Sequence, residues 1–134
     1  MAMTDVQTGL RWKPIALWGL KGLLAAVFLA AGGAKLYGVP MLVEEFEHMG
    51  FGQWLRYFTG ALEVAGGLAI LVPSLSGLAA VLLGCVMIGA TAVHLFVIGG
   101  SPISAVVLLV LCAAIAIVER ARIAAGTAFF RQTT

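Results

Sequence analysis

Four long apolar runs, separated by short breaks, constrain this chain more than any other feature of its sequence. The runs cover residues 14–36, 57–72, 77–98 and 103–118. About 20 residues of helix cross the roughly 30 Å hydrocarbon core of a bilayer, and the second and fourth runs reach that range only with their neighbours. No run shows the alternation that marks a membrane barrel strand. The sequence therefore predicts an all-α, four-helix transmembrane bundle, with helices at about 14–36, 55–74, 77–98 and 102–119.

Composition agrees with a lipid environment. Of the 134 residues, 62% are hydrophobic and 10% are charged, whereas soluble domains are about 45–50% apolar and about 25% charged. The length suits one domain over residues 1–134. The net charge is only +2, without a long run of Lys or Arg, so no nucleic-acid partner is expected. Cys85 and Cys112 form no CxxC motif, which argues against a disulfide scaffold or a zinc module.

The basic residues near the expected helix ends predict the orientation. Five lie towards the two ends of the chain: Arg11, Lys13, Arg120, Arg122 and Arg131. Only Lys35 and Arg56 flank the first loop, so both termini are expected in the cytoplasm. We expect Lys21, seven residues into the first helix, to extend its ammonium group towards the cytoplasmic side. The lysine and the length of this run favour a retained helix over a cleaved signal peptide.

The first loop contains a short amphipathic segment. Pro40 is typical of a helix start and Gly50 of a helix stop. Helical spacing places Leu42, Val43, Phe46 and Met49 on one face and Glu44, Glu45, Glu47 and His48 on the other. The pattern predicts a short helix on the outer membrane surface, between the first two transmembrane helices. The acidic side chains are interpreted as a solvated face, and no metal site is predicted.

Glu63 is an acid inside the second apolar run. Gly60, Glu63 and Gly67 share one helical stripe, and small residues line helix contacts in membranes, so Glu63 should face the bundle interior. At a rise of about 1.5 Å per residue it lies roughly 10 Å below the outer surface. Acids within a membrane are functional by default. The alternative is a neutral acid that donates one hydrogen bond between helices.

Further polar residues fall in the same outer half of the bundle. Arg56 precedes Glu63 by two helical turns, Lys35 ends the first helix, and His94 follows Thr91 near the outer end of the third. We expect these groups to form a pocket, with His94 as the direct partner of Glu63 because its depth is intermediate. The simpler alternative makes Lys35 and Arg56 interfacial anchors and His94 a core histidine. Cys85 is expected on the opposite helix face from His94, without a redox role.

Three segments carry a resemblance to a known family. They are FLAAGGAKLYG, EEFEHMGFG and GALEVAGGLAILVP. Together they resemble the DoxX family of small four-helix membrane proteins over about residues 15–118. The matching positions are Gly32, Lys35, Leu36, Glu45, Gly50, Glu63, Gly66, Gly67 and His94. The resemblance implies a multi-pass protein of a bacterial cytoplasmic membrane, with some relatives linked to thiosulfate:quinone oxidoreductase or to membrane redox complexes. The chain departs from the redox relatives in lacking paired cysteines and a heme-ligating histidine pair.

These observations lead to a functional hypothesis and two alternatives. The hypothesis is an accessory or redox-linked subunit that binds a small anionic or quinone-like ligand in the outer half of the membrane. Glu63 would take or give a proton and His94 would hydrogen-bond the ligand, while Lys35, Arg56 and Thr91 would hold it. Partners would be lipid, redox subunits or further copies of the chain. The alternatives are a small proton-coupled transporter acting as an oligomer, and a structural subunit without chemistry of its own. Whether the protein is an enzyme stays open.

Overall fold

The computed structural model describes residues 2–121, 123 and 124, with side chains from Pro14 onward. The elements in chain order are α1 (Ala2–Tyr37), α2 (Pro40–Met49), α3 (Gln53–Ala69), α4 (Ser76–Val93), the π-helical turn η1 (His94–Ile98) and α5 (Ile103–Val118). The described residues contain no strand, so the all-α prediction is confirmed.

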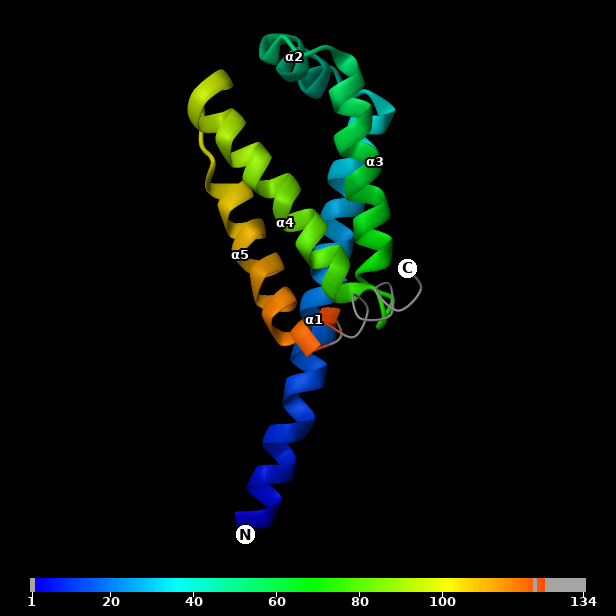
Figure 1. The fold of residues 1–134 in the computed structure, drawn as a ribbon, viewed down its shortest axis with the longest axis vertical. Coiled ribbons are helices and arrows are strands. Elements are labelled where there is room, and N and C mark those ends of the chain that lie inside the picture. Colours follow the sequence, from blue (N-terminus) through cyan, green and yellow to red (C-terminus); the bar gives the residue numbers. More distant parts are fainter. Residues whose placement is uncertain (1, 122, 125–134) are drawn as a thin grey trace.

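The long helices form two pairs. α1 packs mainly on α3, and α4 packs mainly on α5. The two pairs approach each other at one end and diverge towards the end where α2 lies (Figure 1). α2 contacts both α3 and η1, so it links the two pairs at the divergent end.

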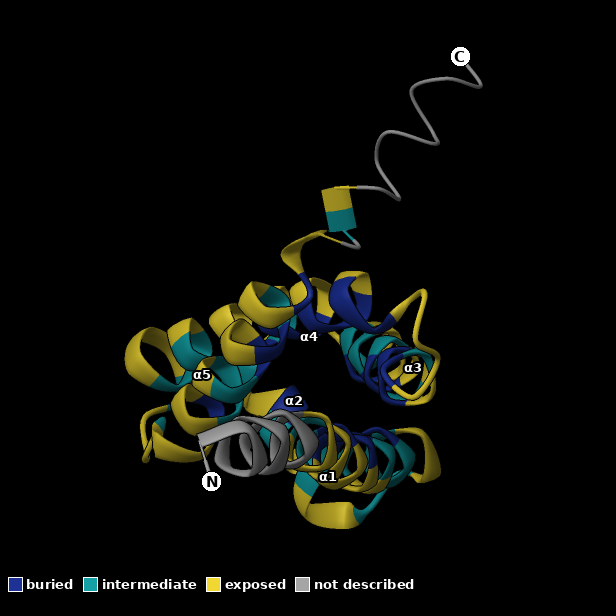
Figure 2. Ribbon diagram, turned by 90° about the horizontal axis from the view of Figure 1, so that it is seen from below, coloured by how far each residue is buried: buried dark blue, intermediate teal, exposed yellow. Residues whose placement is uncertain are grey.

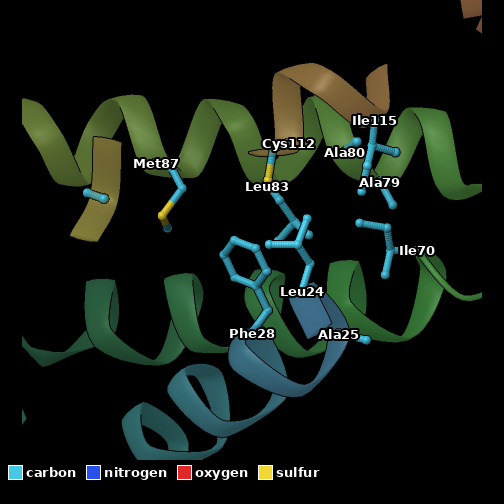
Figure 3. Packing of buried hydrophobic residues seen from close by; sticks show 11 residues of the cluster. Leu24, Ala25, Phe28, Ile70, Ala79, Ala80, Leu83, Met87, Cys112 and Ile115 are labelled. Carbon is cyan, nitrogen blue, oxygen red and sulfur yellow. The ribbon is translucent and has the colours of Figure 1, made fainter. Parts of the chain in front are cut away.

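A hydrophobic core joins the two pairs away from α2. Leu24 and Phe28 of α1 belong to the same buried cluster as Leu83 of α4 and Ile115 of α5 (Figure 3). All four side chains are fully buried. The core therefore closes the end of the bundle where the helix pairs meet.

Glycine contacts bring α1 and α3 close together. A Cβ added at Gly32 would lie 2.7 Å from the carbonyl oxygen of Gly60. One added at Gly67 would lie 3.4 Å from the carbonyl oxygen of Ala25. The predicted contact of Gly60 and Gly67 with another helix is confirmed, because their stripe faces α1. The same stripe turns Glu63 towards α1.

The predicted amphipathic helix is present as α2. It begins at Pro40 and ends at Met49, and the following cap residue, Gly50, has a φ of 77°. This left-handed conformation suits glycine because it has no Cβ. Phe46 is buried while Glu44 and Glu47 are exposed, as the periodicity predicts.

The ends of two helices differ from the prediction. α3 stops at Ala69, whereas the sequence predicted a helix to residue 74. Pro73 disfavours helical backbone in the residue before it, and residues 70–75 are turns and a bend instead. α1 begins far ahead of residue 14 and continues through Pro14.

The outward faces of the helices are apolar. Leu23, Ile88 and Val110 each expose more than half of their surface, and exposed residues lie on the outside of the bundle (Figure 2). Among the described residues, Pro14–Tyr37 and Ser76–Ile98 are long and apolar enough to cross a membrane. α5 is apolar but has only 16 residues. Two of the described helices are therefore candidate membrane spans, and the predicted bundle of four spans is not confirmed by helix length.

The start of the apolar part of α1 and the end of α5 lie together, because Lys21 and Glu119 are in contact. The orientation of this end relative to a membrane stays a prediction. Arg122 and Arg131, on which it partly rests, lie outside the described residues, as do the side chains of Arg11 and Lys13.

Candidate functional site

A cleft of about 530 Å³ lies between the helix pairs at the end where α2 is found. Its walls come from α1, α2, α3, α4, η1 and α5 and are mostly apolar. Phe28, Met87 and Leu108 line the cleft and also belong to or pack against the buried core. The cleft is therefore bounded by the core on the side away from α2.

Lys35 and Glu63 form an ion pair in the cleft wall. The ammonium nitrogen of Lys35 donates to both carboxylate oxygens of Glu63, at 2.9 and 3.1 Å. The side chain of Glu63 is 3% exposed and that of Lys35 is 17% exposed. Both residues line the mostly apolar cleft, so Glu63 is paired there rather than standing alone.

The prediction that His94 is the direct partner of Glu63 is wrong. Lys35 takes that place because the glycine contact lets α1 and α3 approach so closely. A Cβ added at Gly60 would lie 3.0 Å from the Cβ of Lys35, so the lysine is level with Gly60, about one turn from Glu63. Helix rise alone places Lys35 far above Glu63 in depth, and in the fold this difference in depth is much smaller.

Arg56 is buried outside the cleft lining. Its guanidinium group donates to the backbone carbonyl of Lys35, and its Nε donates to Gln53 Oε1 at 2.7 Å. Gln53 in turn donates to the carbonyl oxygen of Val43 in α2 at 3.0 Å. The guanidinium carbon also lies 4.2 Å from the ring centroid of Tyr57. Arg56 thus ties together the ends of α1, α2 and α3, rather than facing the cleft as a ligand-binding group.

His94 lines the cleft at its α2 end. Its Nε2 lies 3.9 Å from Glu45 Oε1, and its Nδ1 lies 3.4 Å from the carbonyl oxygen of Gly99. His94 also begins η1, and short π-helical turns are frequent at functional sites. Thr91 is outside the cleft lining and donates to the carbonyl oxygen of Met87 at 2.7 Å.

The two cysteines have different surroundings. Cys85 is exposed and lines the cleft, whereas Cys112 is buried in the core. The expectation that Cys85 and His94 lie on opposite faces is corrected, since both border the cleft. The described residues contain no cluster of three or more His, Cys, Asp or Glu side chains suited to a metal ion.

A second ion pair, which is buried, was missed by sequence reasoning. Lys21 Nζ donates to Glu119 Oε1 at 2.7 Å, and Lys21 lies 5.0 Å from the ring centroid of Trp18. Lys21 is 2% exposed, so its ammonium group is buried against Glu119, and its predicted extension towards the cytoplasmic side stays a prediction. A lysine within an apolar run needs an acidic partner, and Glu119, directly after the fourth run, was the available signal.

Comparisons with known proteins cover most of the chain. The sequence model of a family described as the DoxX-like family matches residues 19–127. A protein of Bacillus subtilis (strain 168), described as the uncharacterized protein YdgD, is 40% identical over 76 residues. This alignment covers 53% of the present chain and 67% of the relative. No solved structure matches the chain significantly.

Proposed function

The chain belongs to the DoxX-like family, and from that premise we propose that this membrane protein binds a neutral, lipophilic molecule with a hydrogen-bonding head group in its cleft. A quinone is the ligand of this class that best fits a binding site within a membrane. The observation that carries the proposal is the Lys35–Glu63 ion pair in the wall of an otherwise mostly apolar cleft. Ligand sites commonly combine an apolar lining with a few convergent polar groups.

The charges around the cleft favour a neutral ligand over an anion. The positive charge of Lys35 is already matched by Glu63, and Arg56 is engaged with backbone and Gln53. Glu45 adds a further acidic side chain to the lining. An anionic ligand would therefore meet no unmatched cation among these groups.

The polar residues have distinct proposed roles. Lys35 has a third ammonium hydrogen beyond the two directed at Glu63, and this hydrogen would reach a head-group oxygen. Glu63 is the group that would take or give a proton beside that oxygen. His94 and Glu45, at the α2 end of the cleft, would contact the ligand as it enters.

The proposal includes a placement in the membrane. All four long helices would cross a bacterial cytoplasmic membrane as one domain, with both termini in the cytoplasm and α2 on the outer surface. The apolar outward faces of the bundle support this placement. The shorter α3 and α5 would span through local thinning of the bilayer and snorkelling of their flanking residues.

The core favours a binding pocket over a transport path. The cleft is bounded by Phe28, Met87 and Leu108, and beyond them the buried Lys21–Glu119 pair joins α1 to the end of α5. A transporter would need a second opening at that end.

Equilibrium binding to the protein in lipid nanodiscs tests the proposal. The probe is 2,3-dimethoxy-5,6-dimethyl-1,4-benzoquinone, and empty nanodiscs measure its partition into lipid. We expect saturable binding that the double variant Lys35→Met/Glu63→Gln weakens about tenfold or more, because hydrogen bonds to charged groups contribute about 1.5–3 kcal/mol.

The matched control is Lys21→Met/Glu119→Gln, which removes the same kind of ion pair outside the cleft and should bind like the wild type. Uptake no greater than that of empty nanodiscs would contradict the proposal, and so would equal loss in both double variants. Displacement of the quinone by sodium thiosulfate would show that the site prefers an anion.

A further inference from the structure

A shallow apolar groove of about 240 Å³ runs along the seam between α3 and α4. Its lining consists of Ala65, Gly66, Ala69, Leu75, Leu78, Ala79 and Leu82. This lining contains no charged or polar side chain. The groove is therefore unsuited to a polar head group and suited to a hydrocarbon chain.

The groove lies next to the cleft, on the following helical turns of α3 and α4. On α3 the cleft includes Leu62, and the groove begins at Ala65. On α4 the cleft includes Cys85, and the groove begins one turn earlier, at Leu82. Leu82 lines both spaces, so the cleft and the groove are adjacent at this residue.

Short side chains leave this seam partly unfilled. A Cβ added at Gly66 would lie 2.6 Å from Leu83 Cδ2, so glycine allows Leu83 to pack directly against α3. Alanine at positions 65, 69 and 79 leaves the space beside that contact open. Residues 75–82 extend the groove over roughly 10 Å at the rise of a helix.

We infer that this groove holds the hydrocarbon tail of the molecule whose head group lies beside Lys35 and Glu63. The inference rests on the proposed function and narrows its ligand class to long-chain neutral amphiphiles, as opposed to compact molecules. The head group occupies the mixed polar and apolar cleft, and the tail passes Leu82 into the apolar seam. Leu78 and Leu82 are partly open to the surroundings, so lipid hydrocarbon has access to the same seam.

The hydrophobic effect contributes little to binding of the tail, because the tail moves into the groove from lipid, which is equally apolar. Its contribution comes from close packing against the groove walls. A tethered tail also competes well with free lipid chains, since the bound head group raises its local concentration. Tail length should therefore raise affinity beyond the effect of partition into the bilayer.

Three quinones with one head group and different tails test the inference. They carry a methyl, a pentyl or a decyl group at position 6 of 2,3-dimethoxy-5-methyl-1,4-benzoquinone. Binding to wild-type protein in nanodiscs, corrected for partition into empty nanodiscs, should tighten about tenfold from methyl to decyl. Ala65→Leu, which fills the groove from its exposed side, should abolish this gain and leave methyl-quinone binding unchanged.

The matched control is Ala61→Leu, one turn away on α3 and outside both linings, which should keep the gain. Leu78→Ala removes part of the groove wall without adding side-chain volume, and should reduce the gain in affinity from methyl to decyl. It is the replacement test if Ala65→Leu does not fold. A methyl quinone that binds as tightly as the decyl quinone would overturn the inference and leave the proposed function intact. A tail gain retained in Ala65→Leu would also overturn it. Failure of all three quinones to bind would overturn the proposed function as well.

Discussion

Lys21 forms a buried ion pair and Lys35 a partly buried one, and each pair joins α1 to another part of the bundle. Lys35 pairs with Glu63 of α3 beside the cleft, and Lys21 pairs with Glu119 just after α5. Removing one charge of such a pair strongly lowers the stability of the fold, because the other charge is left in a medium of low dielectric constant. Replacing both charged residues together often leaves stability unchanged, because no unpaired charge then remains in the interior. The two pairs therefore lend themselves to double-mutant cycles.

The first cycle concerns the cleft. Lys35→Met and Glu63→Gln should each lower the unfolding free energy, and the double variant should lose less than the sum, with a coupling of about 1–3 kcal/mol. Glu63→Gln and His94→Gln should be additive, because no hydrogen bond joins these residues. Denaturation in mixed micelles measures both cycles. Additivity with Lys35, or coupling with His94, would refute the pairing.

The second prediction concerns the pair far from the cleft. Lys21→Met should cost about 3–5 kcal/mol of unfolding free energy, as expected for half of a buried pair. Arg120→Met, at an exposed position next to Glu119, should change it by no more than about 0.5 kcal/mol. The double variant Lys21→Met/Glu119→Leu should recover most of the loss. Equal unfolding midpoints for Lys21→Met and Arg120→Met would contradict the burial of this ion pair.

At the scale of elements, the contact between α1 and α3 sets the site. Gly32 and Gly60 let the backbones touch, which brings Lys35 level with the turn above Glu63. Arg56 then fixes the last turn of α1 through the carbonyl oxygen of Lys35. A lysine at position 56 would lack the planar guanidinium group, whose separate N–H groups donate to this carbonyl oxygen and to Gln53. Helix packing therefore positions the ion pair before any ligand binds.

Neighbouring glycines in α1 test this contact. Gly32→Ala should lower the unfolding free energy by about 1–3 kcal/mol, because its Cβ would meet backbone atoms of α3 that cannot move aside alone. Gly33→Ala meets nothing within 4 Å and should be neutral or raise stability by up to about 1 kcal/mol, since alanine favours helix. Thermal melts in detergent compare the two variants. A Gly32→Ala midpoint at or above that of Gly33→Ala would mean that α1 and α3 are further apart.

At the scale of the whole molecule, two helix pairs meet in a core at one end and hold a cleft at the other. The core and the Lys21–Glu119 pair close the first end. α2 and the network through Gln53 and Arg56 connect the elements at the second. The apolar outer faces require lipid or another apolar surface around the bundle. This arrangement presents polar side chains to a space that lipophilic molecules can reach.

Much of this architecture could be predicted from the sequence. The apolar runs located the long helices, and the stripe of Gly60 and Gly67 placed Glu63 at a helix contact. The partner of Glu63 could not be predicted, because depth counted along each helix takes no account of how closely two helices cross. Glu119 was missed for a similar reason, since only tertiary packing brings it to Lys21. Arg56 shares the helical face of Glu63, but its hydrogen bonds turn it towards the end of α1.

The reaction of Cys85 with N-ethylmaleimide tests the central claim, ligand binding in the cleft, most directly. Cys85 lines the cleft, and the buried Cys112 is an internal control in the same chain. The methyl quinone has no free ring position for a thiol to attack, so it should act only by occupying the cleft. At ten times its Kd it should slow alkylation of Cys85 about tenfold, by mass action, and leave Cys112 unreactive. An unchanged rate at Cys85 under saturating quinone would contradict the claim.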